Sequence, residues 1–188
     1  KFTSISDALD SYIGYKPMMH MTKTSGILIY PEAHFDMVRL GLGLYGFTND
    51  PQLNSNLKNV LSLKTVISQI HEIEKNESVG YNRGYIANQT MRTATLPIGH
   101  ADGIFRSLGQ GKVFVNINGQ KAPIIGNVCM DMIMVNCSGI SCGEGDEVIL
   151  FGQSPSAEIL SQSVNSISYE LITAISQRVR RVFVKNKS

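Results

Sequence analysis

The residue with the clearest chemical potential is Tyr81, which lies between Gly80 and Gly84. The strand-like runs 63–73 and 92–98 flank this segment. Glycine lets the backbone turn sharply or approach another group closely, so we expect the phenol of Tyr81 to face outward rather than into a core. An outward phenol can act as an acid–base catalyst, and we predict that role for Tyr81. From this segment alone, an ordinary tyrosine at a strand end remains the alternative.

A second chemically useful segment is the hydroxyl-rich loop 22–26, which follows the apolar run 18–21. The hydroxyls of Thr24 and Ser25, together with free backbone amides, are groups that bind an anion such as phosphate. Helix N-caps use the same residue types. A capping role is therefore the alternative for this loop.

A third candidate is Arg39, which stands within the apolar run 37–40 and is followed by the alternating glycines Gly41, Gly43 and Gly46. The pattern predicts a buried strand of parallel type. An unpaired arginine is too costly in such a strand. Arg39 must therefore meet either a structural ion-pair partner or a ligand at the strand's C-terminal end.

Composition predicts a globular protein. The chain has 188 residues, of which 43% are hydrophobic and 17% charged, with a net charge of +2. This balance gives no case for binding nucleic acid. The one basic cluster, 178–181, leads into the apolar residues 182–184, so we predict a strand with one solvent-exposed face over 179–184.

The number of cysteines and the hydropathy of the chain indicate the compartment in which we expect the protein to work. Three cysteines without paired metal-ligand spacing predict reduced thiols in a cytoplasmic protein and no metal site. No stretch reaches the length needed to span a bilayer, so we expect no membrane partner. The first residues contain no apolar leader, and we expect the sequence to begin part-way through a helix.

The elements that position these residues fall into two parts. Residues 1–58 read as two βα units, beginning with a helix over 6–13, and 59–188 as an all-β body. Two βα units cannot bury a parallel sheet on both faces, so we expect an additional N-terminal part. The elements expected in the body are strands 61–73, 93–98, 111–118, 120–125, 132–135, 147–151 and 179–184, helices 156–161 and 168–177, and a hairpin turn at Asn118-Gly119.

In order and spacing, these segments resemble the C-terminal half of alanine racemases, which use pyridoxal phosphate. The resemblance rests on the hydroxyl loop, the Val-Arg-Leu-Gly run at Arg39, the glycine-flanked Tyr81 and the Gly-Asn-Val-Cys-Met-Asp run 126–131. The Leu-Pro-Ile-Gly-His-Ala-Asp-Gly run 96–103 and the tail 168–181 also fit. The tail raises the further hypothesis of a fusion with a cell-wall peptide ligase.

The resemblance implies a fold that is mainly β with an α/β remnant. Residues 1–58 would be the C-terminal remnant of the pyridoxal phosphate-binding (β/α)8 barrel, and 59–188 the C-terminal antiparallel β domain. The lysine that binds the cofactor covalently would lie outside this chain, so no lysine here takes that role. We therefore expect this chain alone to be inactive.

The resemblance also implies a reaction and its bases. In racemisation of L-alanine to D-alanine, for peptidoglycan precursors, Tyr81 would be one base and the absent lysine the other. A free phenol titrates near pH 10, so it needs nearby positive charge or hydrogen bonds to act near neutral pH. Tyr81 and Met130 would reach into the barrel of a partner subunit, which makes the expected assembly a homodimer with shared active sites.

The remaining roles follow from the same resemblance. Arg39 would face the pyridine nitrogen of the cofactor, and Met130 would offer its backbone amide to the substrate carboxylate. Tyr169 and His100 would line the substrate entrance. The residues that would hold the phosphate are Thr24 and Ser25, with the backbone amides of Gly41 and Leu42.

The sequence departs from the family pattern at two places. The loop reads Lys-Thr-Ser at 23–25 where the family has Asn-Ser-Ala, and His100 stands where the family has tyrosine. An imidazole is shorter and can take a charge near neutral pH, so His100 would change access or pH dependence, or else be a packed, hydrogen-bonded histidine. A serine or broad-specificity racemase and a non-catalytic dimerisation module are the alternative functions.

Overall fold

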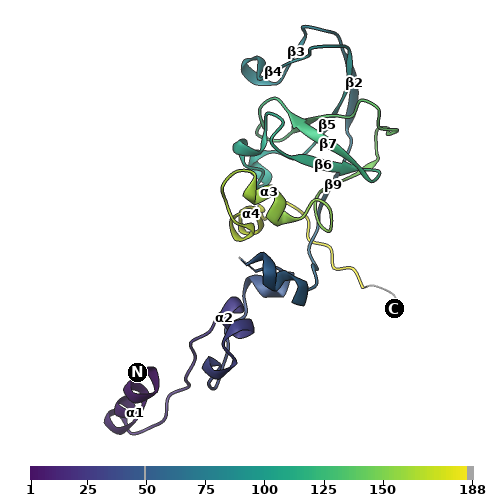
Figure 1. The fold of residues 1–188 in the computed structure, drawn as a ribbon. Coiled ribbons are helices and arrows are strands. Elements are labelled where there is room, and N and C mark those ends of the chain that lie inside the picture. Colours follow the sequence, from purple (N-terminus) through teal and green to yellow (C-terminus); the bar gives the residue numbers. More distant parts are fainter. Residues whose placement is uncertain (49, 186–188) are drawn as a thin grey trace. The chain divides into compact units, whose positions relative to one another are not determined.

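A computed structural model describes residues 1–48 and 50–185 of the protein. The chain divides into two compact units, Lys1–Val60 and Leu61–Ser188 (Figure 1). Among the described residues, no helix is both long enough and apolar enough to cross a bilayer.

The first unit is built from short helices. Helix α1 (Phe2–Ile13) ends at Gly14, whose φ of 77° is the left-handed conformation that glycine adopts at helix C-termini. The expected helix over 6–13 is therefore confirmed and begins earlier. Helix α2 (Thr24–Ile29) starts inside the hydroxyl loop. Three 3-10 helices follow, at Pro31–Ala33, Leu42–Tyr45 and Pro51–Asn56.

The two strands expected in this unit are reduced to one isolated parallel bridge, between His20 and Met37. Arg39 is exposed, so the prediction that it sits in a buried strand is wrong for this chain. A parallel pair needs further strands beside it and cover on both faces. The described part of this unit supplies neither.

The second unit is a seven-stranded sheet in which every paired neighbour is antiparallel, in the order β1-β9-β6-β7-β8-β5-β2. A separate pair, β3 and β4, forms a two-stranded sheet. The strand bounds are β1 Leu63–Val66, β2 Gln69–Ile73, β3 Ser78–Val79, β4 Tyr85–Ile86, β5 Met91–Leu96, β6 Phe114–Ile117, β7 Gln120–Ile125, β8 Ile133–Asn136 and β9 Glu147–Phe151.

Side-chain alternation explains why these segments form strands. In β6 and β8, every second residue is buried and the others are partly exposed, which is the period-two pattern of a sheet with one covered face. The buried members include Ile117 and Ile133. The predicted hairpin turn is confirmed, since Asn118 (φ 49°) and Gly119 (φ 82°) both have the positive φ that a tight turn between β6 and β7 requires.

The structure corrects two elements predicted for the second unit and confirms two others. The run 61–73 is two strands, because the chain leaves β1 at Ile67 and re-enters the sheet as β2. Residues 179–184 form no strand, and Val182, Phe183 and Val184 are exposed. The two helices are confirmed as α3 (Ala157–Gln162) and α4 (Ser168–Ala174), the second shorter than expected.

Strands β3 and β4 form an arm that continues from β2. In Figure 1 this arm lies on the other side of the large sheet from α3 and α4. A small hydrophobic cluster of Val79, Ala87, Met91 and Ile125 joins the arm to β5 and β7. The arm is therefore packed onto the sheet rather than free, and it carries the Tyr81 turn at its tip.

Candidate active site

Tyr81 begins a 3-10 turn, Tyr81–Arg83, between β3 and β4. Gly80 before it has φ 76°, and the next two residues, Asn82 (φ 56°) and Arg83 (φ 52°), are non-glycine residues at positive φ. Such backbone is uncommon and persists where the surroundings impose it. The Tyr81 side chain is 70% exposed. The phenol thus faces outward, as the glycine-flanked segment predicts.

Tyr81 and Met130 line one open cleft of about 310 Å3. The Met130 side chain is 60% exposed. Its carbonyl accepts a hydrogen bond from the Ala101 N–H at 2.9 Å, whereas its own N–H has no acceptor among the described residues. The other residues of the cleft lining are Gly80, Cys129, Asp131, Met132 and Met134. The cleft is thus lined by one residue with an exposed phenol and by another whose amide has no acceptor among the described residues.

A short helix at His100–Asp102 supports the Met130 segment. The backbone N–H of His100 donates to the Cys129 carbonyl at 2.9 Å. The His100 side chain is exposed, so the alternative of a packed histidine is wrong. Tyr169, at the second position of α4, is also exposed. Neither side chain belongs to the cleft lining, so the structure does not bring them into the group formed by Tyr81 and Met130.

The wall of the cleft is held by an ion cluster that the sequence analysis missed. The guanidinium of Arg178 donates to both carboxylate oxygens of Asp102, from Nε at 2.6 Å and from Nη2 at 3.0 Å, and from Nη2 to Asp131 at 2.6 Å. The hydrogen bonds from Arg178 to Asp102 lower the pKa of the Asp102 carboxyl. Burial of Asp102 opposes this shift, and a hydrogen bond from the Gly99 N–H adds to it. Arg178 is 76 residues from Asp102 and 47 from Asp131 in sequence, so no local pattern could have revealed the cluster.

The first unit brings together two of the four residues expected to hold a phosphate, Thr24 and Gly41. The Thr24 hydroxyl accepts from the Gly43 N–H at 3.2 Å and the Gly41 N–H at 3.4 Å. Ser25 and Leu42 are half-buried at the ends of the same segments. Arg39 donates from Nη2 to the Met21 carbonyl at 3.1 Å. Thr24 and Gly41 are thus in direct contact, and Arg39 contacts the residue just before the loop.

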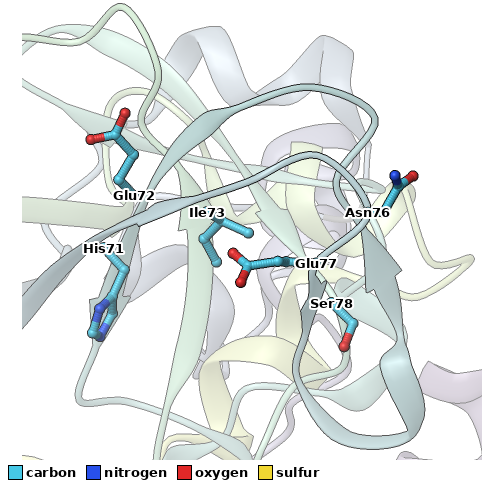
Figure 2. Close-up of a pocket in the computed structure, with 6 residues that line it drawn as sticks. All are labelled: His71, Glu72, Ile73, Asn76, Glu77 and Ser78. Carbon is cyan, nitrogen blue, oxygen red and sulfur yellow. The ribbon is translucent and has the colours of Figure 1, made fainter.

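A second pocket lies on β2 and β3 (Figure 2). It measures about 500 Å3 and is lined by His71, Glu72, Ile73, Asn76, Glu77 and Ser78. In Figure 2, His71 and Glu72 project to opposite sides of their strand. The Glu77 carboxylate accepts from the Glu74 N–H at 2.8 Å, which gives it a structural role. Across residues 1–48 and 50–185, no three His, Cys, Asp or Glu side chains gather as a metal site, and the three cysteines are free.

Comparison with known proteins follows the division of the chain. Residues 60–183 match the family model described as "Alanine racemase, C-terminal domain", and residues 1–49 match "Alanine racemase, N-terminal domain". Alanine racemase 1 of Clostridium acetobutylicum is 39% identical over 175 residues, covering 89% of this chain and 45% of that protein. The chain thus spans about half the length of the curated relatives it matches.

Solved structures agree with the sequence matches. An alanine racemase of Clostridium difficile in complex with cycloserine aligns with a TM-score of 0.89 at 34% identity, over 100% of this chain and 51% of the other. An alanine racemase of Bartonella henselae with covalently bound pyridoxal phosphate aligns with a TM-score of 0.79 at 29% identity, over 97% of this chain and 52% of the other. The resemblance and the mainly β fold class are confirmed, and this chain belongs to the alanine racemase family.

Proposed function

We propose that the protein carrying this chain interconverts L- and D-alanine with pyridoxal phosphate, and that this chain is its C-terminal half. The observation that carries the proposal is the cleft in which the exposed phenol of Tyr81 and the available N–H of Met130 lie together. Membership of the alanine racemase family supports the same reaction. The D-alanine would serve peptidoglycan precursors.

The loop around Thr24 fits the phosphate of the cofactor. The hydrogen bonds from Gly41 and Gly43 to the Thr24 hydroxyl are long, at 3.4 and 3.2 Å, so both amides can also donate to an anion. A Cβ at position 43 would lie 2.6 Å from Cγ2 of Thr24, so the close approach requires glycine. The hydroxyl of Thr22 is buried and has no hydrogen-bond partner within the described chain. Ser25 and the Leu42 amide complete the set of proposed phosphate contacts.

Arg39 would face the pyridine nitrogen of the cofactor. When bound, pyridoxal phosphate supplies an electron sink for the charge left on the substrate Cα when its proton is removed. A guanidinium stays charged at all working pH values. Beside the ring nitrogen it would disfavour protonation there, which weakens the sink and limits side reactions such as transamination. Its present hydrogen bond to the Met21 carbonyl orients the side chain and leaves its other donors for a ligand.

Racemisation requires that a proton leave one face of Cα and return to the other. Tyr81 would act at one face, and a lysine outside this chain at the other. The free N–H of Met130 would bind the substrate carboxylate, which orients Cα toward the phenol oxygen. His100 and Tyr169, both exposed, would line the route by which substrate enters.

The exposure of Tyr81 and Met130 also supports a homodimer with shared sites. Tyr81 and Met130 are 70% and 60% exposed, so most of their surface is available to another polypeptide. An exposed pair of this kind can complete a cofactor site that another subunit provides. We propose that the cleft of one subunit faces the barrel of its partner.

Complementation between two halves of the enzyme tests the proposal. The chain 1–188 is mixed with the N-terminal half of the Clostridium acetobutylicum relative and pyridoxal phosphate, and conversion of L- to D-alanine is followed. Either polypeptide alone should be inactive, and the mixture should racemise alanine. The matched control is the relative's own two halves. If that control regains activity and the mixture with this chain does not, the proposal is wrong. Equal turnover of serine would widen the substrate class.

A further inference from the structure

The backbone of the Tyr81 turn is unusual enough to need a support. Gly80, Asn82 and Arg83 all have positive φ, and two of them are not glycine. Tyr81 is mostly exposed in this chain, so packing within its own unit does not fix the direction of the ring. Within this unit, the position from which the phenol extends therefore depends on the groups that hold the backbone of the turn.

That support is the side-chain amide of Asn127. Its Nδ2 donates to the Tyr81 carbonyl at 2.8 Å, and its Oδ1 accepts from Nε2 of Gln110 at 3.1 Å. Both ends of the amide are thus used, and this network fixes which end faces the turn. A Cβ on Gly84 would lie 2.6 Å from Nδ2 of Asn127. The turn therefore closes directly over this side chain.

Asn127 also belongs to the segment that forms the opposite wall of the cleft. It stands three residues before Met130, whose segment is anchored by the hydrogen bonds from His100 and Ala101. Gly126, which immediately precedes Asn127, lies so close to β3 that a Cβ at this position would be 2.9 Å from the Val79 carbonyl oxygen. A single segment thus positions both the phenol and the amide that would bind substrate.

We propose that Asn127 is the positioning residue for Tyr81, holding the phenol in register with the Met130 amide. The inference rests on the proposed function, because it assumes that Tyr81 is one of the two bases. Asn127 would touch neither substrate nor cofactor. Its role is to keep the phenol oxygen within reach of the substrate Cα, and a displacement of about 1 Å can cost on the order of 10²-fold in rate.

The test uses the full-length enzyme and the variant Asn127→Asp, which keeps the shape but cannot donate to the Tyr81 carbonyl. L- and D-alanine have equal free energies, so kcat/KM must fall equally in both directions, by about 10- to 100-fold. The isotope effect of an α-deuterium on kcat/KM separates the bases. It should rise for the enantiomer whose proton Tyr81 removes and fall for the other, because only the step at Tyr81 becomes slower.

One further variant and one control complete the design. Gln110→Ala removes only the hydrogen-bond partner of the Asn127 amide. The isotope effect should again rise for one enantiomer and fall for the other, but both changes should be smaller than in Asn127→Asp. Asn88→Asp adds the same charge at an exposed position just after β4 and should change neither rate nor isotope effect. Far-UV circular dichroism and cofactor absorbance verify that each variant is folded and loaded.

The outcomes separate this inference from the function on which it rests. If Tyr81→Phe is slow while Asn127→Asp and Gln110→Ala keep wild-type rates and isotope effects, Asn127 does not position the tyrosine. Isotope effects that shift in the same direction for both enantiomers would also overturn the inference, because general loosening of the site would do that. If Tyr81→Phe is as fast as wild type, the base assignment itself is wrong.

Discussion

At the scale of single residues, the proposed chemistry divides between a phenol and a guanidinium that both stand exposed in this chain. Tyr81 lies on a cleft beside an available amide, and Arg39 donates one hydrogen bond to the Met21 carbonyl. Neither residue has a carboxylate partner among the ion pairs of the described chain. The phenol of Tyr81 and the remaining donors of the Arg39 guanidinium are thus available for a ligand.

Replacing Arg39 with glutamate tests its contact with the cofactor. A carboxylate beside the pyridine nitrogen would favour its protonation, which strengthens the electron sink. We expect Arg39→Glu to shift the absorbance maximum of the bound cofactor, to lower the racemisation rate and to increase transamination of D- or L-alanine to pyruvate. Arg106→Glu, at an exposed arginine of the second unit, is the charge-matched control. An unchanged spectrum with cofactor fully bound would contradict the contact.

The sequence indicated the exposure of Tyr81, but it did not indicate the side chains that hold the proposed site in place. Tyr81 lies in a glycine-flanked motif, so its exposure could be predicted locally, whereas Met130 was identified only through the family resemblance. Asn127 and Arg178 act through partners 46 and 76 residues away. Such contacts exist only after the chain has folded, and neither side chain differs in type from an ordinary surface residue.

At the scale of elements, the Arg178 cluster joins the C-terminal tail to the His100 turn and to the Met130 segment. Asp102 is buried, and its backbone carbonyl also accepts from the Ser176 N–H at 3.1 Å. Removing the guanidinium would leave a buried carboxylate without its cation, which is strongly destabilising. The cluster thus stabilises the wall of the cleft.

We expect Arg178→Met to lower the melting temperature at neutral pH, and Arg180→Met, at a nearby exposed arginine, to leave it nearly unchanged. The loss of stability caused by Arg178→Met should depend on pH. Because Arg178 lowers the pKa of Asp102 below its ordinary 3.8, the stabilisation is complete above that value and is lost as pH falls through the lower folded pKa. The difference in unfolding free energy between wild type and Arg178→Met should therefore shrink below about pH 4. A difference that is constant with pH would contradict this account.

The arm that carries Tyr81 depends on the hydrophobic cluster beneath it. Ile125 of β7 is 3% exposed and belongs to that cluster, whereas Ile159 of α3 is 51% exposed. We expect Ile125→Ala to lower the unfolding free energy by about 2–5 kcal/mol and Ile159→Ala by less than about 0.5 kcal/mol. Urea unfolding followed by circular dichroism measures both, since the chain has no tryptophan. Equal losses would mean that the cluster does not anchor the arm.

Strands of the second unit were predictable because alternation is a local property, and most of them appear within two or three residues of their expected bounds. The expected strand over 179–184 fails for a physical reason. Arg178 turns toward two carboxylates instead of continuing an alternating face, and the following residues find no strand to pair with among the described residues. The alternation of apolar and polar residues alone could not distinguish the strands that form from the run 179–184, which does not form one.

At the scale of the whole molecule, the first unit leaves much apolar surface uncovered. Helix α1 buries no residue. Large apolar patches on a protein mark surfaces that another polypeptide covers. The exposed apolar residues of this unit include Ile5, Leu9, Tyr12, Tyr15, Met18, Met21, Ile29, Tyr30 and Leu40. We expect the remainder of the barrel to cover them, which agrees with a chain spanning about half the length of its relatives.

In the proposed reaction, Tyr81 acts as a base toward alanine bound against a second polypeptide. The most direct measurement is the steady-state rate of the full-length enzyme with Tyr81→Phe, assayed in both directions after circular dichroism and cofactor absorbance have shown a folded, loaded protein. Removing the phenol oxygen alone should slow racemisation by about 10²- to 10⁴-fold in both directions. Rates equal to wild type in both directions would contradict the account.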